Sequence, residues 1–154
     1  MTDVILRATP ELCDEVSNLV FKLLRDLVGH RKEIDPRKIA VTSKKLLSDA
    51  KGFYAFLYRR RSESIGVITV SKSAAIYAGG YYGVIEELYV EPEFRSQSIG
   101  RTLLETVVGF AAVQGWSRLE VSTPEKEKWQ RTIDFYLREG FSDNANGERL
   151  KREL

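Results

Sequence analysis

Apolar residues recur at helical spacing near the start of the chain, over residues 10–28. They are Leu12, Val16, Leu19, Val20, Leu23, Leu24 and Leu27. This spacing predicts an amphipathic helix with one buried stripe. Thr9 followed by Pro10 predicts its start, with Thr9 as the capping residue, and Gly29 predicts its end. A second helix is predicted over residues 36 to about 48.

Five shorter segments rich in β-branched and aromatic residues predict strands. They span residues 4–8, 53–58, 64–70, 84–90 and 118–122. The polar run between the second and third of these segments, residues 59–63, predicts a hairpin turn. Gly79 and Gly80 predict another turn, shortly before the fourth segment.

Two more helices are predicted in the second half of the chain. The first covers residues 99 to about 114, where Gly115 stops it. It is apolar around most of its circumference, so neighbouring elements should cover it on several sides. The second helix opens at Pro124 and closes at Gly140. From Phe141 onward we expect a weak final strand and a charged tail.

The resulting order of elements, β-α-α-β-β-β-α-β-α-β, predicts an α+β fold around a mixed sheet. A chain of 154 residues fits one domain of common size. We find no internal repeat and no low-complexity linker in the sequence. The expectation is therefore a single domain over residues 1–154.

Composition narrows the classes of partner. The chain is 43% apolar and 30% charged, with a net charge of +2, which is typical of an ordinary globular protein. This charge is too small to favour nucleic-acid or membrane binding by bulk electrostatics. We interpret the basic cluster Arg59, Arg60 and Arg61 as solvated charge. With neither a signal-peptide core nor an apolar run long enough to span a bilayer, the expected location is cytoplasmic.

One cysteine, Cys13, and one histidine, His30, limit the available chemistry. They exclude an internal disulfide, a thiolate metal cluster and a histidine-based catalytic triad. They also argue against a zinc site. We therefore expect no metal.

A polar loop separates the strand that ends near Val90 from the helix that begins at Ile99. Its sequence, EPEFRSQSIGR, holds more polar and basic residues than a turn requires. A helix start that follows a strand exposes unpaired N–H groups and the positive end of the helix dipole, and this combination binds phosphate or pyrophosphate. Arg95 and Arg101 add positive charge. The ATP-loop and dinucleotide fingerprints are absent, and taken alone the loop fits a merely structural turn equally well.

Two adjacent acids, Glu86 and Glu87, lie inside the apolar strand before this loop. Strand alternation predicts that they face opposite sides of the sheet. Burying a carboxylate is unfavourable unless it has a partner or a function. One alternative is that one acid faces solvent while the other pairs with an arginine.

The loop and its flanks resemble the GNAT superfamily of N-acetyltransferases. The family's diagnostic loop is Arg or Gln, two variable residues, Gly, one variable residue, then Gly or Ala, and residues 95–100, RSQSIG, match it except at Ser98. The segments LYVEPEFR and FYLREGF and the order of elements are also similar, so the resemblance covers nearly the whole chain. It implies a GNAT-like single domain with a central, twisted, mostly antiparallel sheet flanked by helices.

The resemblance also implies acetyl-CoA as the cosubstrate. In the family the loop holds its pyrophosphate, which here implicates Arg95, Ser96, Gln97, Ser98, Ile99, Gly100 and Arg101. The backbone of the preceding strand would bind pantetheine as a neighbouring strand does, through Leu88, Tyr89 and Val90.

Two residues depart from the family pattern. Ser98 replaces a glycine. If this position needs a positive φ, serine costs on the order of 1–3 kcal/mol, whereas in a first helical turn it would cap the helix, which is the interpretation we favour. Trp129 stands where the family often has asparagine, and either packs against the cofactor or belongs to the core or the rim.

Acetyl transfer to an amine needs a base, because an alkylammonium with a pKa near 10.4 requires roughly 4–5 kcal/mol to lose its proton at pH 7. By resemblance Glu86 occupies the frequent general-base position, and Glu87 is the reserve candidate and a binder of the amine. Tyr136 matches the family's general acid toward the departing thiolate. Its alternative is a core aromatic, the role we expect for Phe135.

The sequence therefore predicts an acetyl-CoA-dependent N-acetyltransferase that acts on a primary amine of a small molecule, protein or peptide. The alternatives are a non-catalytic acyl-CoA-binding module and a nucleic-acid-binding protein that uses the cluster at residues 59–61. Residues 29–50 and the YAGGYYG hairpin should shape the acceptor pocket without identifying the acceptor. We expect no nucleic-acid or membrane partner. Homodimers are common in the family and are an option here.

Overall fold

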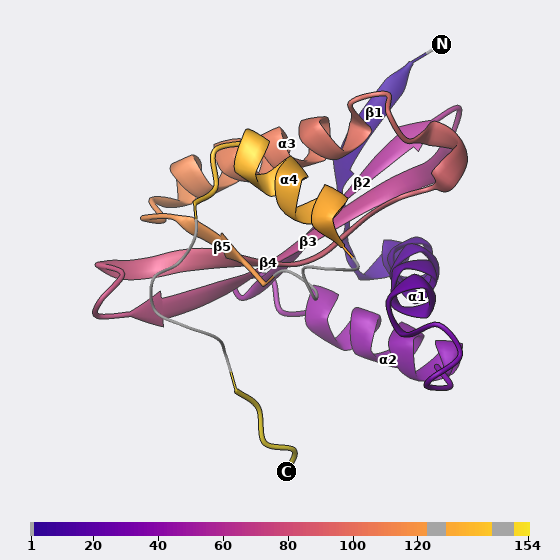
Figure 1. The fold of residues 1–154 in the computed structure, drawn as a ribbon, viewed down its shortest axis with the longest axis horizontal. Coiled ribbons are helices and arrows are strands. Elements are labelled where there is room, and N and C mark those ends of the chain that lie inside the picture. Colours follow the sequence, from indigo (N-terminus) through magenta and orange to yellow (C-terminus); the bar gives the residue numbers. More distant parts are fainter. Residues whose placement is uncertain (1, 123–128, 143–149) are drawn as a thin grey trace. The chain divides into compact units, whose positions relative to one another are not determined.

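The computed structural model describes residues 2–122, 129–142 and 150–154. The chain forms two compact units, Met1–Ser122 and Thr123–Leu154. Their elements are labelled in Figure 1.

The first unit is built on a five-stranded sheet. Its strands are β1 (Asp3–Arg7), β2 (Phe53–Arg60), β3 (Glu63–Ala75), β4 (Gly80–Val90) and β5 (Leu119–Val121). They lie in the order β1-β2-β3-β4-β5 (Figure 1). Neighbours among the first four strands are antiparallel, whereas β5 runs parallel to β4. The mostly antiparallel sheet predicted from the sequence is confirmed.

Helices cover both faces of this sheet. They are α1 (Cys13–Val28), α2 (Pro36–Leu47) and α3 (Ile99–Gln114). Side chains of β2 alternate between the faces: Ala55 and Leu57 pack in one core cluster with residues of α1 and α2. Tyr54 and Phe56 instead meet Phe110 of α3, with ring centroids 4.6 and 5.4 Å apart. Alternation along a strand therefore assigns α1 and α2 to one face and α3 to the other.

Helix α1 starts differently from the prediction. A short 3-10 turn, η1 (Pro10–Leu12), precedes it, and the Thr9 side chain makes no capping hydrogen bond. The N–H of Leu12 instead donates to the Thr9 carbonyl, 2.9 Å away. The Thr9 backbone therefore binds this N–H group, and the prediction that the Thr9 hydroxyl caps the helix is wrong. Gly29, with φ of +58°, ends the helix as predicted.

The hairpin between β2 and β3 is tighter than the sequence indicated. Only Arg61 and Ser62 form its turn, with φ of +52° and +68°, a geometry that suits the twist of two antiparallel strands. The strands thus continue through the basic run. Arg59 pairs with Glu15 at 2.6 Å. Arg60 lies opposite Asp3 in the β1–β2 register and forms an ion pair with it. The interpretation of this run as solvated charge is therefore wrong for Arg59 and for Arg60.

The second unit contains α4 (Gln130–Arg138). The ring of Tyr136 lies edge-on to those of Phe135 and Phe141, at centroid distances of 5.2 and 5.3 Å. The predicted helix start at Pro124 and residues 143–149 of the predicted final strand lie outside the described residues, and the described residues 141–142 and 150–154 form no strand.

Two findings concern the described residues as a whole. None of the helices in this part of the chain is long and apolar enough to cross a membrane. Within the same residues, no group of His, Cys, Asp and Glu side chains is arranged to hold a metal ion.

Candidate active site

The outer edge of β4 is only partly paired. Strand β5 pairs with residues 83–85, and beyond Ile85 no other described strand lies on this side. The N–H of Glu91 donates to the Ile65 carbonyl of β3 at 2.9 Å. By alternation the main-chain groups of Leu88 and Val90 point the other way, to the open edge. Because Arg95 Nε donates to the Val90 carbonyl at 2.8 Å, the groups left to bind a ligand here are the Leu88 N–H and C=O and the Val90 N–H.

The loop after β4 adopts a strained conformation. A short 3-10 turn, η2 (Pro92–Phe94), is followed by Ser96 and Ser98, both with φ of +63°. Ser98 is therefore left-handed, and its side chain makes no capping hydrogen bond. The prediction that the Ser98 side chain caps the helix is wrong. The alternative prediction, that this position has a positive φ, is confirmed.

The start of α3 presents main-chain donors. The Ser98 carbonyl accepts hydrogen bonds from the N–H and the hydroxyl of Thr102, at 3.0 and 2.8 Å. The N–H groups of Ile99 and Gly100 precede this first helical hydrogen bond and have no partner within the helix. They lie at the positive end of the helix dipole, an arrangement suited to a phosphate or pyrophosphate.

A network from the opposite edge of the sheet holds this loop. Arg60 donates to the side chain of Gln97 at 2.9 Å and makes two hydrogen bonds to Asp3, at 3.0 and 2.9 Å. Its guanidinium also lies 5.5 Å from the ring centre of Phe94. Hydrogen bonds from Arg60 and from Tyr58 lower the pKa of Asp3 to about 2, so the carboxylate that orients Arg60 stays ionised at any ordinary pH.

The two arginines predicted to bind phosphate both contact protein groups. Arg95 lies 3.9 Å from Asp26 and stacks 5.3 Å from the ring centre of Tyr89. Arg101 pairs with Glu105, one turn further along α3, at 3.2 Å. In this structure both arginine side chains are therefore engaged with protein groups.

An irregularity in β4 changes the orientation of the two acids. The register places Ile85 opposite Val70 and Glu87 opposite Thr69, so Glu86 is an extra residue, a β-bulge. The Glu86 carboxylate accepts a hydrogen bond from Ser71 at 2.7 Å, and that of Glu87 accepts one from Thr69.

Thr69 and Ser71 share one face of β3, the face on which Val67 packs with α1 and α2. The prediction that Glu86 and Glu87 face opposite sides is wrong, because the bulge breaks the alternation. Both carboxylates belong to the α1 and α2 face.

Glu87 is the more buried of the two acids. Glu86 is exposed, whereas Glu87 is half-buried, and its own N–H donates to the Thr69 hydroxyl at 3.0 Å. Burial raises the pKa of Glu87; the hydrogen bond from Thr69 opposes this shift, and the charge of Glu86 adds to it. The sequence analysis missed Thr69, although a hydroxyl inside the otherwise apolar segment GVITV was a signal for it.

Glu87 opens onto a cavity of about 220 Å³ between the sheet and the two helices. Its wall is mostly apolar, with Thr69 and Glu87 on the sheet side and polar residues of α2 opposite. The lining residues are Val16, Val20, Leu24, Lys38, Ile39, Thr42, Ser43, Leu46, Phe53, Thr69 and Glu87. A carboxylate with a raised pKa in such a cavity is typical of a catalytic base.

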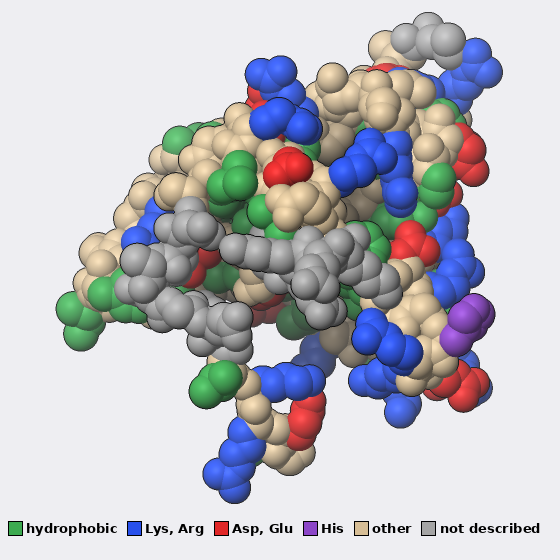
Figure 2. All heavy atoms as spheres, viewed as in Figure 1, with side chains coloured by type: hydrophobic (Ala, Val, Ile, Leu, Met, Phe, Trp, Pro, Cys, Tyr) green, Lys and Arg blue, Asp and Glu red, His purple; other side chains and the backbone are tan. Residues whose placement is uncertain are grey.

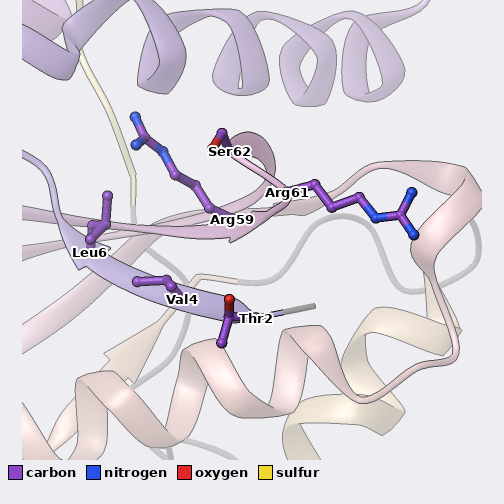
Figure 3. A pocket seen from close by; sticks show the side chains of 6 residues that line it. All are labelled: Thr2, Val4, Leu6, Arg59, Arg61 and Ser62. Atoms are coloured by element: carbon purple, nitrogen blue, oxygen red, sulfur yellow. The ribbon is translucent and has the colours of Figure 1, made fainter.

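A larger cavity, of about 360 Å³, lies elsewhere, at the edge formed by β1 and the β2–β3 turn. Two strands separate β1 from β4. The lining arginines, Arg59 and Arg61, point away from each other rather than toward one ligand (Figure 3). None of the described residues that line this cavity carries a carboxylate, so they offer no counterpart to the chemistry expected of Glu87.

Tyr136 and Trp129 belong to the second unit. Tyr136 is 5% exposed, and burial raises the pKa of its phenol, which therefore stays protonated at neutral pH. Trp129 is half-buried at the start of α4, where its carbonyl accepts hydrogen bonds from the N–H groups of Thr132 and Ile133, at 3.0 and 3.2 Å.

Comparisons with known proteins identify the family of this chain. Residues 50–143 match the family model described as an acetyltransferase (GNAT) domain. An aminoalkylphosphonate N-acetyltransferase of Salmonella typhimurium is 31% identical over 137 residues, covering 89% of this chain and 83% of that protein. An IAA acetyltransferase of Azospirillum brasilense is 34% identical over 96 residues, covering 62% of this chain and 60% of that protein.

Solved structures share the fold. A possible acetyltransferase from Clostridium difficile 630 superposes with a TM-score of 0.82 at 16% identity, with both chains fully covered. An aminoglycoside acetyltransferase from a soil metagenome, in complex with sisomicin, gives a TM-score of 0.77 at 18% identity, covering 99% of this chain and 96% of the other.

The family match and the sequence relatives identify the chain as an acyltransferase. The chain belongs to the GNAT superfamily of acetyltransferases, whose cosubstrate is acetyl-CoA and whose members transfer an acyl group to an amine. The alternative of a non-catalytic acyl-CoA-binding module finds no support in these relatives.

The strain at Ser98 gives a direct test of the loop geometry. Replacing Ser98 by glycine removes an unfavourable left-handed conformation, so Ser98→Gly should raise the free energy of unfolding by about 1 kcal/mol, measured by urea denaturation. Ser48→Gly is the matched control, because Ser48 has φ of −77° and no such strain to relieve, and it should lower the stability. Equal losses in the two variants would contradict the left-handed assignment.

Proposed function

We propose that this protein transfers the acetyl group of acetyl-CoA to the primary amine of a small molecule. The observation that carries the proposal is Glu87, a half-buried carboxylate with a raised pKa that opens onto a cavity, next to the open edge of β4. The curated relatives include proteins named for aminoalkylphosphonate and for thialysine, both of which are amines, and this supports an amine acceptor.

We place acetyl-CoA between the open edge of β4 and the start of α3. The Leu88 and Val90 main-chain groups would hydrogen-bond the amide groups of pantetheine, as a neighbouring strand would. The N–H groups of Ile99 and Gly100 would bind the pyrophosphate. Gln97 would act through its contact with Arg60, which holds the loop in place.

We assign the general base to Glu87 rather than to Glu86. A base must take a proton from an alkylammonium whose pKa is near 10.4, and a carboxylate with a raised pKa is better matched to that task. Glu86 is exposed and adjacent to Glu87, and its charge would attract the ammonium group and stabilise it before deprotonation.

Tyr136 is the proposed general acid. Burial raises the pKa of its phenol, so the phenol is protonated at neutral pH and holds the proton that the departing thiolate of CoA would take. The phenol would be restored when it recovers a proton from solvent.

The base assignment is tested by Glu87→Gln. Turnover, followed by release of free CoA thiol, should fall by roughly 10²–10³ at pH 7 and recover partly in alkaline buffer, where the amine deprotonates by itself. Glu86→Gln is the matched control and should mainly raise the KM of the amine. A larger loss of kcat in Glu86→Gln than in Glu87→Gln would move the base to Glu86.

The same variant has an expected effect on stability. A raised pKa means that the folded chain holds the proton of Glu87 more tightly than the unfolded chain does, so stability is lost as the pH rises through this pKa. The variant Glu87→Gln cannot ionise there and should melt at the same temperature as the wild type, or higher, at pH 8. This separates loss of activity from loss of fold.

The acid assignment is tested by Tyr136→Phe. The change removes one oxygen and keeps the ring contacts to Phe135 and Phe141, so kcat should fall by roughly 10²–10⁴ while acetyl-CoA still raises the melting temperature. Tyr54→Phe makes the same change at a buried tyrosine that packs against α3 and should leave kcat unchanged. Wild-type turnover of Tyr136→Phe from pH 6 to 9 would make Tyr136 a core aromatic.

A further inference from the structure

The helix that forms one wall of the Glu87 cavity is strongly basic. Helix α2 carries Arg37, Lys38, Lys44 and Lys45 and no acidic residue, although the whole chain has a net charge of only +2. Lysine and arginine side chains are the dominant charged groups over this part of the surface (Figure 2). Any acceptor that enters beside α2 therefore meets positive charge.

Lys38 and Glu87 line the same cavity from opposite walls. Lys38, Thr42 and Leu46 are four residues apart and share one side of α2, while Glu87 and Thr69 lie on the sheet. Among the described residues Lys38 forms no ion pair and the Thr42 hydroxyl forms no hydrogen bond. The cavity is thus lined by one exposed cationic side chain and one exposed hydroxyl that have no partner among the described residues, on the helix across from the proposed base.

The rest of the cavity lining is mostly apolar. It comes from side chains of α1, α2 and β2, among them Val20, Ile39 and Phe53. The cavity, at about 220 Å³, is smaller than the roughly 300–1,000 Å³ of sites that enclose drug-sized ligands. It suits a small molecule with a short apolar body and a charged group at each end.

The electrostatics select between classes of amine. A polyamine or an aminoglycoside would place a second ammonium near Lys38 and the other cations of α2, where like charges repel. A carboxylate or phosphonate at this position would instead accept charge-assisted hydrogen bonds from Lys38 and a hydrogen bond from Thr42.

We propose that the acceptor is a small primary amine that also carries an anionic group, a carboxylate or a phosphonate, bound by Lys38 while the amine faces Glu87. This inference rests on the proposed function and names its substrate class. Lys38 is then a specificity-determining residue, because it discriminates between amines without taking part in proton transfer.

The test compares amines that differ only in the distal group. The wild-type protein is assayed for CoA release with 3-aminopropanoate, 3-aminopropylphosphonate, propylamine and spermidine. At least one of the two anionic amines should have a kcat/KM at least about tenfold above those of propylamine and spermidine. The ratio between the two anionic amines then distinguishes a carboxylate from a phosphonate site. A kcat/KM for spermidine or propylamine that equals or exceeds the kcat/KM of both anionic amines would overturn the proposal.

Variants of α2 test the role of Lys38. Lys38→Met should raise the KM of the preferred anionic amine about tenfold and leave kcat, and the KM of propylamine, unchanged. Lys45→Met is the matched control, because Lys45 lies on the same helix but does not line the cavity, and it should alter neither. An equal effect of Lys38→Met on propylamine and on the anionic amine would overturn the assignment.

Failure of the two proposals is distinguishable. If spermidine or an aminoglycoside is acetylated while the anionic amines are not, the substrate class is wrong and acetyl transfer to an amine stands. If no amine in the panel, nor an aminoglycoside, releases CoA from a folded protein whose melting temperature acetyl-CoA raises, the proposed function fails and the substrate class fails with it.

Discussion

The extra residue in β4, Glu86, is the constraint on which the site depends. A bulge bends and twists its strand and disrupts local pairing. In this chain it turns two adjacent carboxylates to the face covered by α1 and α2. The pairing of β4 with β5 stops at Ile85, just before the bulge, so the main chain of Leu88 and Val90 is left at an open edge. The bulge in the β3–β4 pairing and the end of the β4–β5 pairing thus lie next to each other at the acid pair.

Two unfavourable features of the site are offset by specific contacts. The burial of Glu87 is unfavourable for its ionised form, and Thr69 stabilises it by accepting from its N–H and donating to its carboxylate. The positive φ angles of Ser96 and Ser98 strain the loop, and the Gln97 side chain between them is held by Arg60. Such conformations persist only where surrounding contacts determine them, and Asp3 and Tyr58 supply that support from β1 and β2.

The sequence predicted elements better than it predicted contacts. The bounds of α3 agree with the prediction, because a polar loop and Gly115 flank an uninterrupted apolar run. The sequence could not predict the bulge. Strand alternation treats Glu86 and Glu87 as two regularly paired residues, whereas a bulge depends on the register with the neighbouring strand. The bond between Arg60 and Gln97 joins residues 37 positions apart, and no local pattern specifies it. The family pattern located the loop, but only the structure shows that Ser98 has a positive φ.

The central claim is that the fold raises the pKa of Glu87 so that it serves as the base. The most direct measurement is an NMR titration of the glutamate side-chain carbonyl carbons, with the Glu87 signal assigned as the one absent from Glu87→Gln. The account predicts a midpoint for Glu87 above the ordinary value of about 4.3, and an acid limb of the kcat/KM profile with that same midpoint. A Glu87 midpoint at or below the ordinary value would contradict it.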